Sequence, residues 1–147
     1  MKQAAMKYPY SKASEEKLST CDPDLQRVFR RVGDFWDHTI IEGHREKPLQ
    51  EMYFKTGRSK VPWPDSKHNK TPSEAVDAGP YPLRWPDKIV RSEEYTKDLC
   101  RWYMFAGFVL ATACSMGINL RLGSDWDGDK NLNDQTFDDV PHFELVR

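Results

Sequence analysis

The chain has 147 residues with 22 basic and 23 acidic side chains, which gives a formal net charge of −1 at pH 7. This balance excludes a strongly basic nucleic-acid binder and an acidic tail protein. With 38% hydrophobic and 12% aromatic residues, the chain is too rich in core-forming side chains to be disordered. We expect a single domain over residues 1–147, built around one hydrophobic core.

No targeting or membrane-spanning segment is predicted. The first residues carry lysines without an apolar stretch, so no secretory signal peptide is expected. The longest mostly apolar run, Trp102 to Gly117, is shorter than the roughly 20 residues that span a bilayer, and it indicates a buried helix instead. The three cysteines are widely spaced and form no CxxC pair, so we expect inert thiols rather than a thiolate metal site or a redox site.

Helical and extended patterns alternate in the first half of the chain. Residues 22–33 begin with Asp-Pro-Asp, continue with apolar residues at helical spacing and end at a glycine, which predicts a helix. The β-branched run at 38–43 predicts a strand, and residues 48–55 predict a short helix. Residues 57–86 are rich in Pro, Ser and Gly, and we interpret them as a functional loop that carries one short strand at 75–78.

The second half contains the longest predicted helix, at residues 92–117, with a broad apolar face. A strand is predicted at 119–122, a polar and acidic segment at 123–139 and a last strand at 142–146. The order of these elements predicts an α+β fold, in which a small, mostly antiparallel sheet packs against helices and the long helix is central.

Two of the four histidines lie near carboxylates at spacings that fit a metal site. A catalytic zinc ion takes three His or carboxylate ligands and leaves its fourth position to water. His68, Asp77 and His142 could supply these ligands, and Asp139 could act as a general base if the turn through residues 140–141 brings it close. Spacing alone leaves solvated surface groups as the simpler alternative.

The motifs around these residues resemble those of the zinc-dependent D-Ala-D-Ala peptidases and the related phage L-alanyl-D-glutamate endopeptidases. The matching motifs are Ser66-x-His68, Ala75-x-Asp77 and Asp139-x-x-His142. Segments 75–81, 125–126 and 142–145 resemble the phage endolysin branch, and the similarity extends from about Leu18 to the C-terminus. One departure is that His68 and Asp77 are two residues further apart than the matching residues of the family. The glycine that the family has between them is absent here.

The resemblance implies a hedgehog- or D-Ala-D-Ala peptidase-like fold with a zinc site at the edge of the sheet. It implies one Zn²⁺ per chain, bound by His68, Asp77 and His142, and Asp139 as the catalytic base. The implied function is a zinc metallopeptidase of phage lysis that hydrolyses peptidoglycan stem peptides at the L-Ala–D-Glu bond. A D-Ala-D-Ala carboxypeptidase or dipeptidase remains an alternative, as does a non-catalytic zinc scaffold used for binding or in a virion.

Further side chains are expected around this site. The resemblance places Arg45 at the end of the first strand, where it would bind a substrate carboxylate or stabilise the oxyanion. Ser66 is expected to hydrogen-bond near a ligand. Three tryptophans in loops near the motifs, Trp63, Trp85 and Trp126, are candidates for the wall of the substrate cleft, and Trp126 is our choice among them.

The resemblance also implies a partner and a location. The partner is bacterial peptidoglycan, with no nucleic-acid or membrane partner, and the protein is expected to act as a monomer without a separate wall-binding domain. It would remain in the host bacterial cytoplasm until lysis and then reach the periplasm and cell wall, where recognition would come from the cleft or a local patch.

The acidic segment has a second interpretation. Carboxylates at relative positions 1, 3, 5 and 10 resemble the start of an EF-hand calcium loop: Asp125, Asp127, Asp129 and Asp134. However, the glycine expected at position 6 is Lys130, and the glutamate expected at position 12 is Thr136. A solvated acidic loop is therefore favoured, and a Ca²⁺-binding loop beside the zinc cleft is the alternative.

Overall fold

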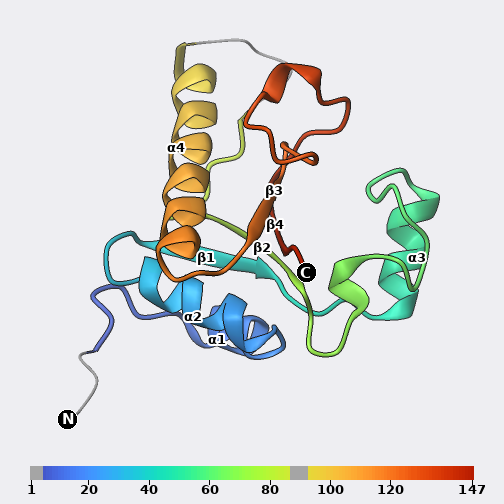
Figure 1. Cartoon of the computed structure of the whole chain (residues 1–147), viewed down its shortest axis with the longest axis horizontal. Coiled ribbons are helices and arrows are strands. Elements are labelled where there is room, and N and C mark those ends of the chain that lie inside the picture. The colour runs from blue at the N-terminus through green and yellow to red at the C-terminus, as the bar shows by residue number, and fades with distance from the viewer. Residues whose placement is uncertain (1–4, 87–92) are drawn as a thin grey trace.

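A four-stranded antiparallel sheet with strand order β1-β2-β4-β3 forms the centre of the computed structural model, which describes residues 5–86 and 93–147 (Figure 1). The strands are β1 (His38–Glu42), β2 (Ala75–Pro80), β3 (Leu120–Gly123) and β4 (Asp139–Leu145). The helices of the described residues are α1 (Lys12–Ser19), α2 (Pro23–Val32), α3 (Lys47–Lys55) and α4 (Glu93–Ser115), with short 3-10 helices η1 (Lys67–Asn69) and η2 (Leu132–Asp134). The predicted α+β fold is confirmed.

Helix α2 forms where the sequence predicts it. The side chain of Asp22 accepts a hydrogen bond from the backbone N–H of Asp24 at 2.9 Å, and Pro23 occupies the first turn, where its missing N–H costs nothing. Gly33 ends the helix. The apolar residues at helical spacing face inward and are buried: Leu25, Val28, Phe29 and Val32.

The core lies between one face of the sheet and helices α2 and α4. Figure 1 shows α4 extending alongside the sheet, with α1 and α2 packed below it and α3 at the opposite end of the molecule. The ring of Phe143 on β4 packs against those of Phe29 and Phe105, with centroids 5.5 and 6.4 Å apart. The inward face of α4 is formed by Trp102, Phe105, Ala106, Val109 and Ala113, whereas Tyr103 is only partly buried.

Helix α1 was not predicted, because its sequence gives little amphipathic signal. Only Ser14 and Leu18 of its eight residues are buried, so the apolar periodicity that marks α2 is missing. A signal was present at its start, where the side chain of Ser11 accepts a hydrogen bond from the backbone N–H of Ser14 at 3.2 Å.

The structure also bears on membrane-spanning helices and on the three cysteines. Among the described residues, no helix is both long and apolar enough to cross a membrane. The cysteines are free thiols, with Cys21 buried and Cys100 and Cys114 exposed.

Strand β4 begins three residues earlier than predicted, at Asp139 instead of His142. Its pairing with β3 is interrupted by a bulge, since Leu122 pairs with Phe143 while the adjacent Gly123 pairs with Asp139. This irregularity accommodates Pro141 within the strand and changes the direction of the side chains before it. Asp139 is therefore brought to the site by a bulged strand rather than by the expected turn.

The sheet register separates the core from a polar face. Val76 pairs with Phe143 and Asp77 pairs with His142 in adjacent positions of β2 and β4. Because side chains alternate between the faces of a sheet, Val76 and Phe143 enter the core together while Asp77 and His142 lie on the opposite face. The site thus lies on the two central strands, which differs from the expected position at the sheet edge because β3 pairs on the outer side of β4.

This packing leads to a stability prediction. Phe143→Ala should lower the free energy of unfolding by about 3–5 kcal/mol, since it leaves a cavity between two other buried rings. Phe35→Ala removes the same atoms from a ring that is 57% exposed, and it should cost less than about 1 kcal/mol. Urea unfolding monitored by circular dichroism measures both changes, and equal losses in the two variants would contradict the core assignment.

Candidate metal centre

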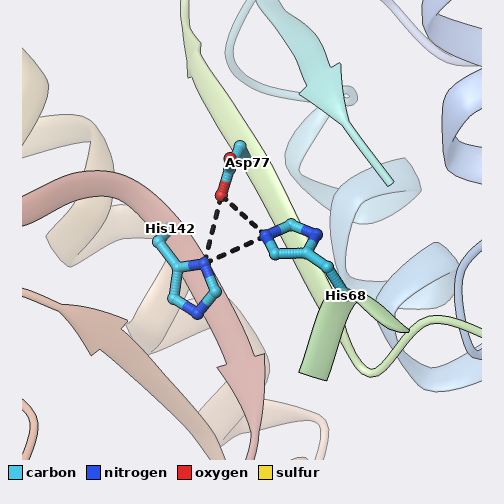
Figure 2. A group of neighbouring side chains, drawn as sticks. All are labelled: His68, Asp77 and His142. Atoms are coloured by element: carbon cyan, nitrogen blue, oxygen red, sulfur yellow. Dashed lines mark hydrogen bonds and ion pairs between the residues drawn. The ribbon is translucent and has the colours of Figure 1, made fainter. Parts of the chain in front are cut away.

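Three side chains converge on the polar face of the sheet, as Figure 2 shows. His68 Nε2 lies 3.2 Å from Asp77 Oδ1 and 3.1 Å from His142 Nδ1, and the latter two atoms are 3.1 Å apart. All three side chains are shielded from solvent, and they form a group that could hold a metal ion. The structure therefore brings together the three ligands that the sequence predicted.

Local structure fixes each of these side chains. Asp77 and His142 are directly opposed across β2 and β4, so their side chains are neighbours on one face. His68 lies in η1, which is capped by Ser66. The Ser66 hydroxyl accepts a hydrogen bond from the backbone N–H of His68, and the Asn69 side chain accepts one from the backbone N–H of Ser66, each at 3.2 Å. Ser66 thus fixes the backbone that carries His68.

The outer hydrogen bonds determine which ring nitrogen of each histidine carries a proton. His68 Nδ1 donates to the carbonyl of Gly43 at 2.7 Å, which leaves a lone pair on Nε2. His142 Nε2 donates to the carboxylate of Glu144 at 2.9 Å, which leaves Nδ1 as the nitrogen that a metal would bind after its proton is lost. His68 Nε2 and His142 Nδ1 both face Asp77 Oδ1, so three candidate ligand atoms converge on one point.

Arg121 and Glu144 extend this arrangement. Arg121 is paired with Glu144 across β3 and β4, and its Nε donates to Glu144 Oε1 at 3.0 Å. Burial alone would raise the pKa of Glu144, but the hydrogen bonds from His142 and Arg121 lower it to about 2. Glu144 therefore stays ionised and keeps His142 oriented. Neither residue was singled out in the sequence, although the spacing of His142 and Glu144 on one strand places both on one face.

Without a metal, the negative charge of Asp77 is balanced by a proton on His142. Burial disfavours the charged form of His142, but the hydrogen bonds that it donates to Asp77 and Glu144 outweigh burial and raise its pKa to about 10. Burial likewise raises the pKa of Asp77, yet the charges and hydrogen bonds of His68 and His142 hold it well below its usual range. The metal-free protein thus holds a buried ion pair, and a bound cation would displace its proton.

The donor set fits a small divalent cation such as zinc. Zinc bonds to His nitrogen and carboxylate oxygen at about 2.0–2.2 Å, which places tetrahedral ligand atoms roughly 3.3 Å from one another. The three ligand atoms here are 3.1–3.2 Å apart. Two neutral imidazoles with one carboxylate are also a ligand combination that catalytic zinc sites use.

Asp139 lies beside this group at the start of β4. Burial raises the pKa of its carboxyl group to about 6, and the negative charge of Asp77 acts in the same direction. Gly123 opposite allows the close approach, since a Cβ atom there would lie 2.4 Å from the Asp139 carbonyl oxygen and 2.8 Å from His142 Cβ. A carboxyl group that titrates near neutral pH beside a metal-binding group has the properties of a general base.

Arg45 is buried behind the centre and held by several partners. Its Nε and Nη2 donate to the two carboxylate oxygens of Glu42, at 3.1 and 2.6 Å, and Nη1 donates to Gln50 Oε1 at 2.9 Å. Nη2 also lies 3.9 Å from Asp77 Oδ2. The sequence pointed to Arg45 but missed Glu42 and Gln50, because contacts between a strand and the next helix have no fixed spacing.

Two hollows meet at the centre. The larger, about 740 Å³, is lined by Asp77 and by the neighbouring rings of Trp85 and Trp102, which are tilted by 32° with centroids 4.5 Å apart. The smaller, about 470 Å³, contains His68 and His142 in its lining. The residues that line both are Arg45, Arg58, Phe137 and Asp139. Together they form a cleft that passes over the metal-binding group.

The loop tryptophans differ in their distance from this cleft. Trp126 lines the smaller hollow, with its ring 5.5 Å from that of His142 and stacked on Phe137 at 6.0 Å. Its Nε1 donates to the Phe137 carbonyl at 2.7 Å, which fixes the ring in place. Trp85 lines the larger hollow, and Trp63 lines neither of the two.

The two extra residues between His68 and Asp77 do not disturb the group of candidate ligands. Residues 70–72 are exposed, whereas Ser73 is buried and bridges to the segment after α1. Ser73 N–H donates to the Thr20 carbonyl at 2.9 Å, and Asp22 N–H donates to the Ser73 carbonyl at 2.8 Å. The extra length is therefore absorbed before β2 begins.

The acidic loop brings three of its four carboxylates together. Ligand oxygens of Asp125, Asp127 and Asp129 lie within 4.8 Å of one another, and this group does not include Asp134. Backbone N–H groups within the loop already bind all three of these side chains, with Lys130 donating to Asp125, Asp129 to Asp127 and Asn131 to Asp129. Calcium binding by this loop stays a prediction.

Comparisons with known proteins agree with this geometry. The family model of phage L-alanyl-D-glutamate peptidases matches residues 6–146. The L-alanyl-D-glutamate peptidase of Escherichia phage T5 is 31% identical over 147 residues, covering 96% of this chain and 100% of that protein. The crystal structure of the Serratia marcescens L-Ala D-Glu endopeptidase ChiX matches with a TM-score of 0.67 at 26% identity, covering 93% of this chain and 89% of that one.

The fold, the metal-binding group and these relatives define a peptidase. The chain belongs to the phage L-alanyl-D-glutamate peptidase family. The family resemblance inferred from the sequence motifs is thereby confirmed.

The raised pKa of Asp139 leads to a prediction for the metal-free protein. Because its pKa is higher in the folded than in the unfolded chain, Asp139 stabilises the fold at low pH, and this contribution is lost as pH rises through about 6. Asp139→Asn should therefore be more stable than the wild type by up to about 3 kcal/mol at pH 8, and similar at pH 4.

Urea unfolding in the presence of a chelator tests this difference. Asp138→Asn changes the exposed neighbouring carboxylate and serves as the control, with no gain expected at either pH. Equal free energies of unfolding for the two variants at pH 8 would show that the pKa of Asp139 is not raised in the folded protein.

Proposed function

We propose that the chain is a zinc peptidase that hydrolyses the L-Ala–D-Glu bond of peptidoglycan stem peptides in phage lysis. The observation that carries this proposal is the convergence of His68 Nε2, Asp77 Oδ1 and His142 Nδ1 at the centre of a cleft. The printed activities of the phage T5 and Serratia relatives support the choice of bond.

In this proposal, His68, Asp77 and His142 hold the metal and Asp139 moves the proton. A bound zinc ion would lower the pKa of a water ligand to about 7 and polarise the scissile carbonyl. Asp139 takes a proton from the attacking water and passes it to the leaving amine. Burial beside the three candidate ligands raises the pKa of its carboxyl group, which makes it a better proton acceptor than an exposed aspartate.

Arg45 supplies positive charge next to the reaction centre. Arg45 lines both hollows, and Glu42 and Gln50 hold its guanidinium in place, 3.9 Å from Asp77 Oδ2. Charge that is fixed before the reaction stabilises a developing oxyanion better than a mobile side chain does. We therefore assign Arg45 to the stabilisation of negative charge on the substrate or in the transition state.

The setting of this activity is part of the proposal. The substrate would be bacterial peptidoglycan, recognised through the cleft by a monomer with a single catalytic domain. The enzyme would stay in the host cytoplasm until lysis and then act on the wall.

Digestion of purified peptidoglycan, followed by mass spectrometry of the new termini, tests the proposed function. The account predicts new amino termini on D-Glu and new carboxyl termini on L-Ala. Release of D-Ala would indicate a carboxypeptidase instead, and the lack of new termini with zinc-loaded protein would indicate a binding protein.

Matched variants assign the roles in the same assay. Chelation should stop cleavage and zinc should restore it. His68→Ala should lose both zinc and activity, whereas Asp139→Asn should keep one zinc per chain and lose about 10²–10⁴ in kcat. Retained turnover in Asp139→Asn would eliminate the proposed base.

A further inference from the structure

The cations that line the smaller hollow differ in whether a carboxylate already balances them. Arg45 is bound by Glu42, and Arg121 is bound by Glu144. Lys67 lies 3.7 Å from Glu74 and donates to the Leu145 carbonyl at 2.6 Å. These three cations are therefore engaged within the protein.

Arg58 and Lys60 are different. Within residues 5–86 and 93–147, neither forms an ion pair or a side-chain hydrogen bond. Each is held over an aromatic ring instead, with the Arg58 guanidinium 4.2 Å from the centre of the Tyr53 ring and the Lys60 ammonium 5.1 Å from that of Phe137. Cation–π contacts orient a side chain while its N–H donors remain available.

The backbone that carries these two cations is tied to the centre through Gln50. This side chain is fully buried, and its Nε2 donates to Ser59 Oγ at 2.9 Å and to the Val61 carbonyl at 2.8 Å. Its Oε1 accepts from Arg45, as described above, and from Asn69 at 3.3 Å. Gln50 thus links residues 58–61 to Arg45 and to the loop that holds His68.

The position of the two cations relates them to the reacting bond. Arg58 lines both hollows together with Asp139, so it lies where the cleft crosses the centre. Lys60 lines the smaller hollow with His68 and His142. Of the acidic residues there, Glu144 is balanced by Arg121, which leaves Asp65 and the proposed base Asp139.

We propose that Arg58, assisted by Lys60, binds the free carboxylate of the D-glutamyl residue next to the scissile bond. This inference rests on the proposed function, because a D-glutamyl residue on the leaving side of an L-Ala–D-Glu bond carries a free carboxylate unless that group is amidated. A guanidinium binds a carboxylate through two parallel hydrogen bonds, and the ammonium of Lys60 adds a point charge. Arg58 therefore determines specificity for an acid over its amide at this position.

Binding of two probes to the zinc-loaded full chain tests this inference without requiring turnover. One probe is a peptide whose D-glutamyl residue has a free carboxylate. The other is the same peptide with the carboxylate of that D-glutamyl residue converted to an amide. Calorimetry should show the acid binding about 10- to 100-fold more tightly to the wild type. Arg58→Gln should remove most of this preference, and Lys60→Gln should reduce it.

Lys55→Gln is the matched control. It removes one positive charge at the end of α3, is exposed, and lines neither hollow. It should keep the full preference. Equal affinity of the wild type for the acid and amide probes would overturn the inference. So would an Arg58→Gln variant that loses the same affinity for both probes, or a Lys55→Gln variant that loses the preference for the acid to the same extent as Arg58→Gln.

The cleavage assay separates this inference from the proposed function. Acid and amide substrates that contain the L-Ala–D-Glu bond should show the same discrimination in kcat/KM as in binding, mainly through KM. A wild type that prefers the acid probe but cleaves neither substrate would retain the binding site and refute the peptidase. Cleavage of both substrates with equal kcat/KM would refute the role of Arg58 and retain the peptidase.

Discussion

The site depends on the antiparallel pairing of β2 with β4, which sets Asp77 directly opposite His142. The same register places Val76 and Phe143 in the core, so hydrophobic burial on one face fixes the metal-binding group on the other. A shift by one residue would exchange the two faces. Two of the three candidate ligands are therefore held by strands whose other face is buried in the core, whereas His68 lies in η1, where the carbonyl of Gly43 orients it.

This arrangement buries several charged groups close together, and without a metal their burial costs stability. A buried ion pair between Asp77 and His142 and a carboxyl group at Asp139 with a raised pKa lie in one cleft. A bound cation would balance these carboxylates, so metal binding and stability are coupled. Hydrogen bonds further out, from Arg121 through Glu144 to His142, keep the donor atoms oriented in its absence.

Local sequence signals predicted the elements with clear periodicity or caps, such as α2 and α4, and missed the polar α1. The motifs identified His68, Asp77, His142 and Asp139, whose convergence the structure displays. Sequence could not give the bulge that directs Asp139, nor the contacts of Gln50 with residues 59–61, because both depend on tertiary packing. The expected edge position was wrong for the same reason, since the pairing of β3 outside β4 is not encoded locally.

The central claim is that outer hydrogen bonds fix opposite tautomers in the two histidines, so that their lone pairs meet at the metal. Long-range ¹H–¹⁵N NMR of the histidine side chains in the zinc-loaded protein measures this directly. The account predicts that His68 carries its proton on Nδ1 and His142 on Nε2, with the other nitrogen of each ring shifted by zinc. The reverse tautomer in either ring, or ring nitrogens unaffected by zinc, would contradict it.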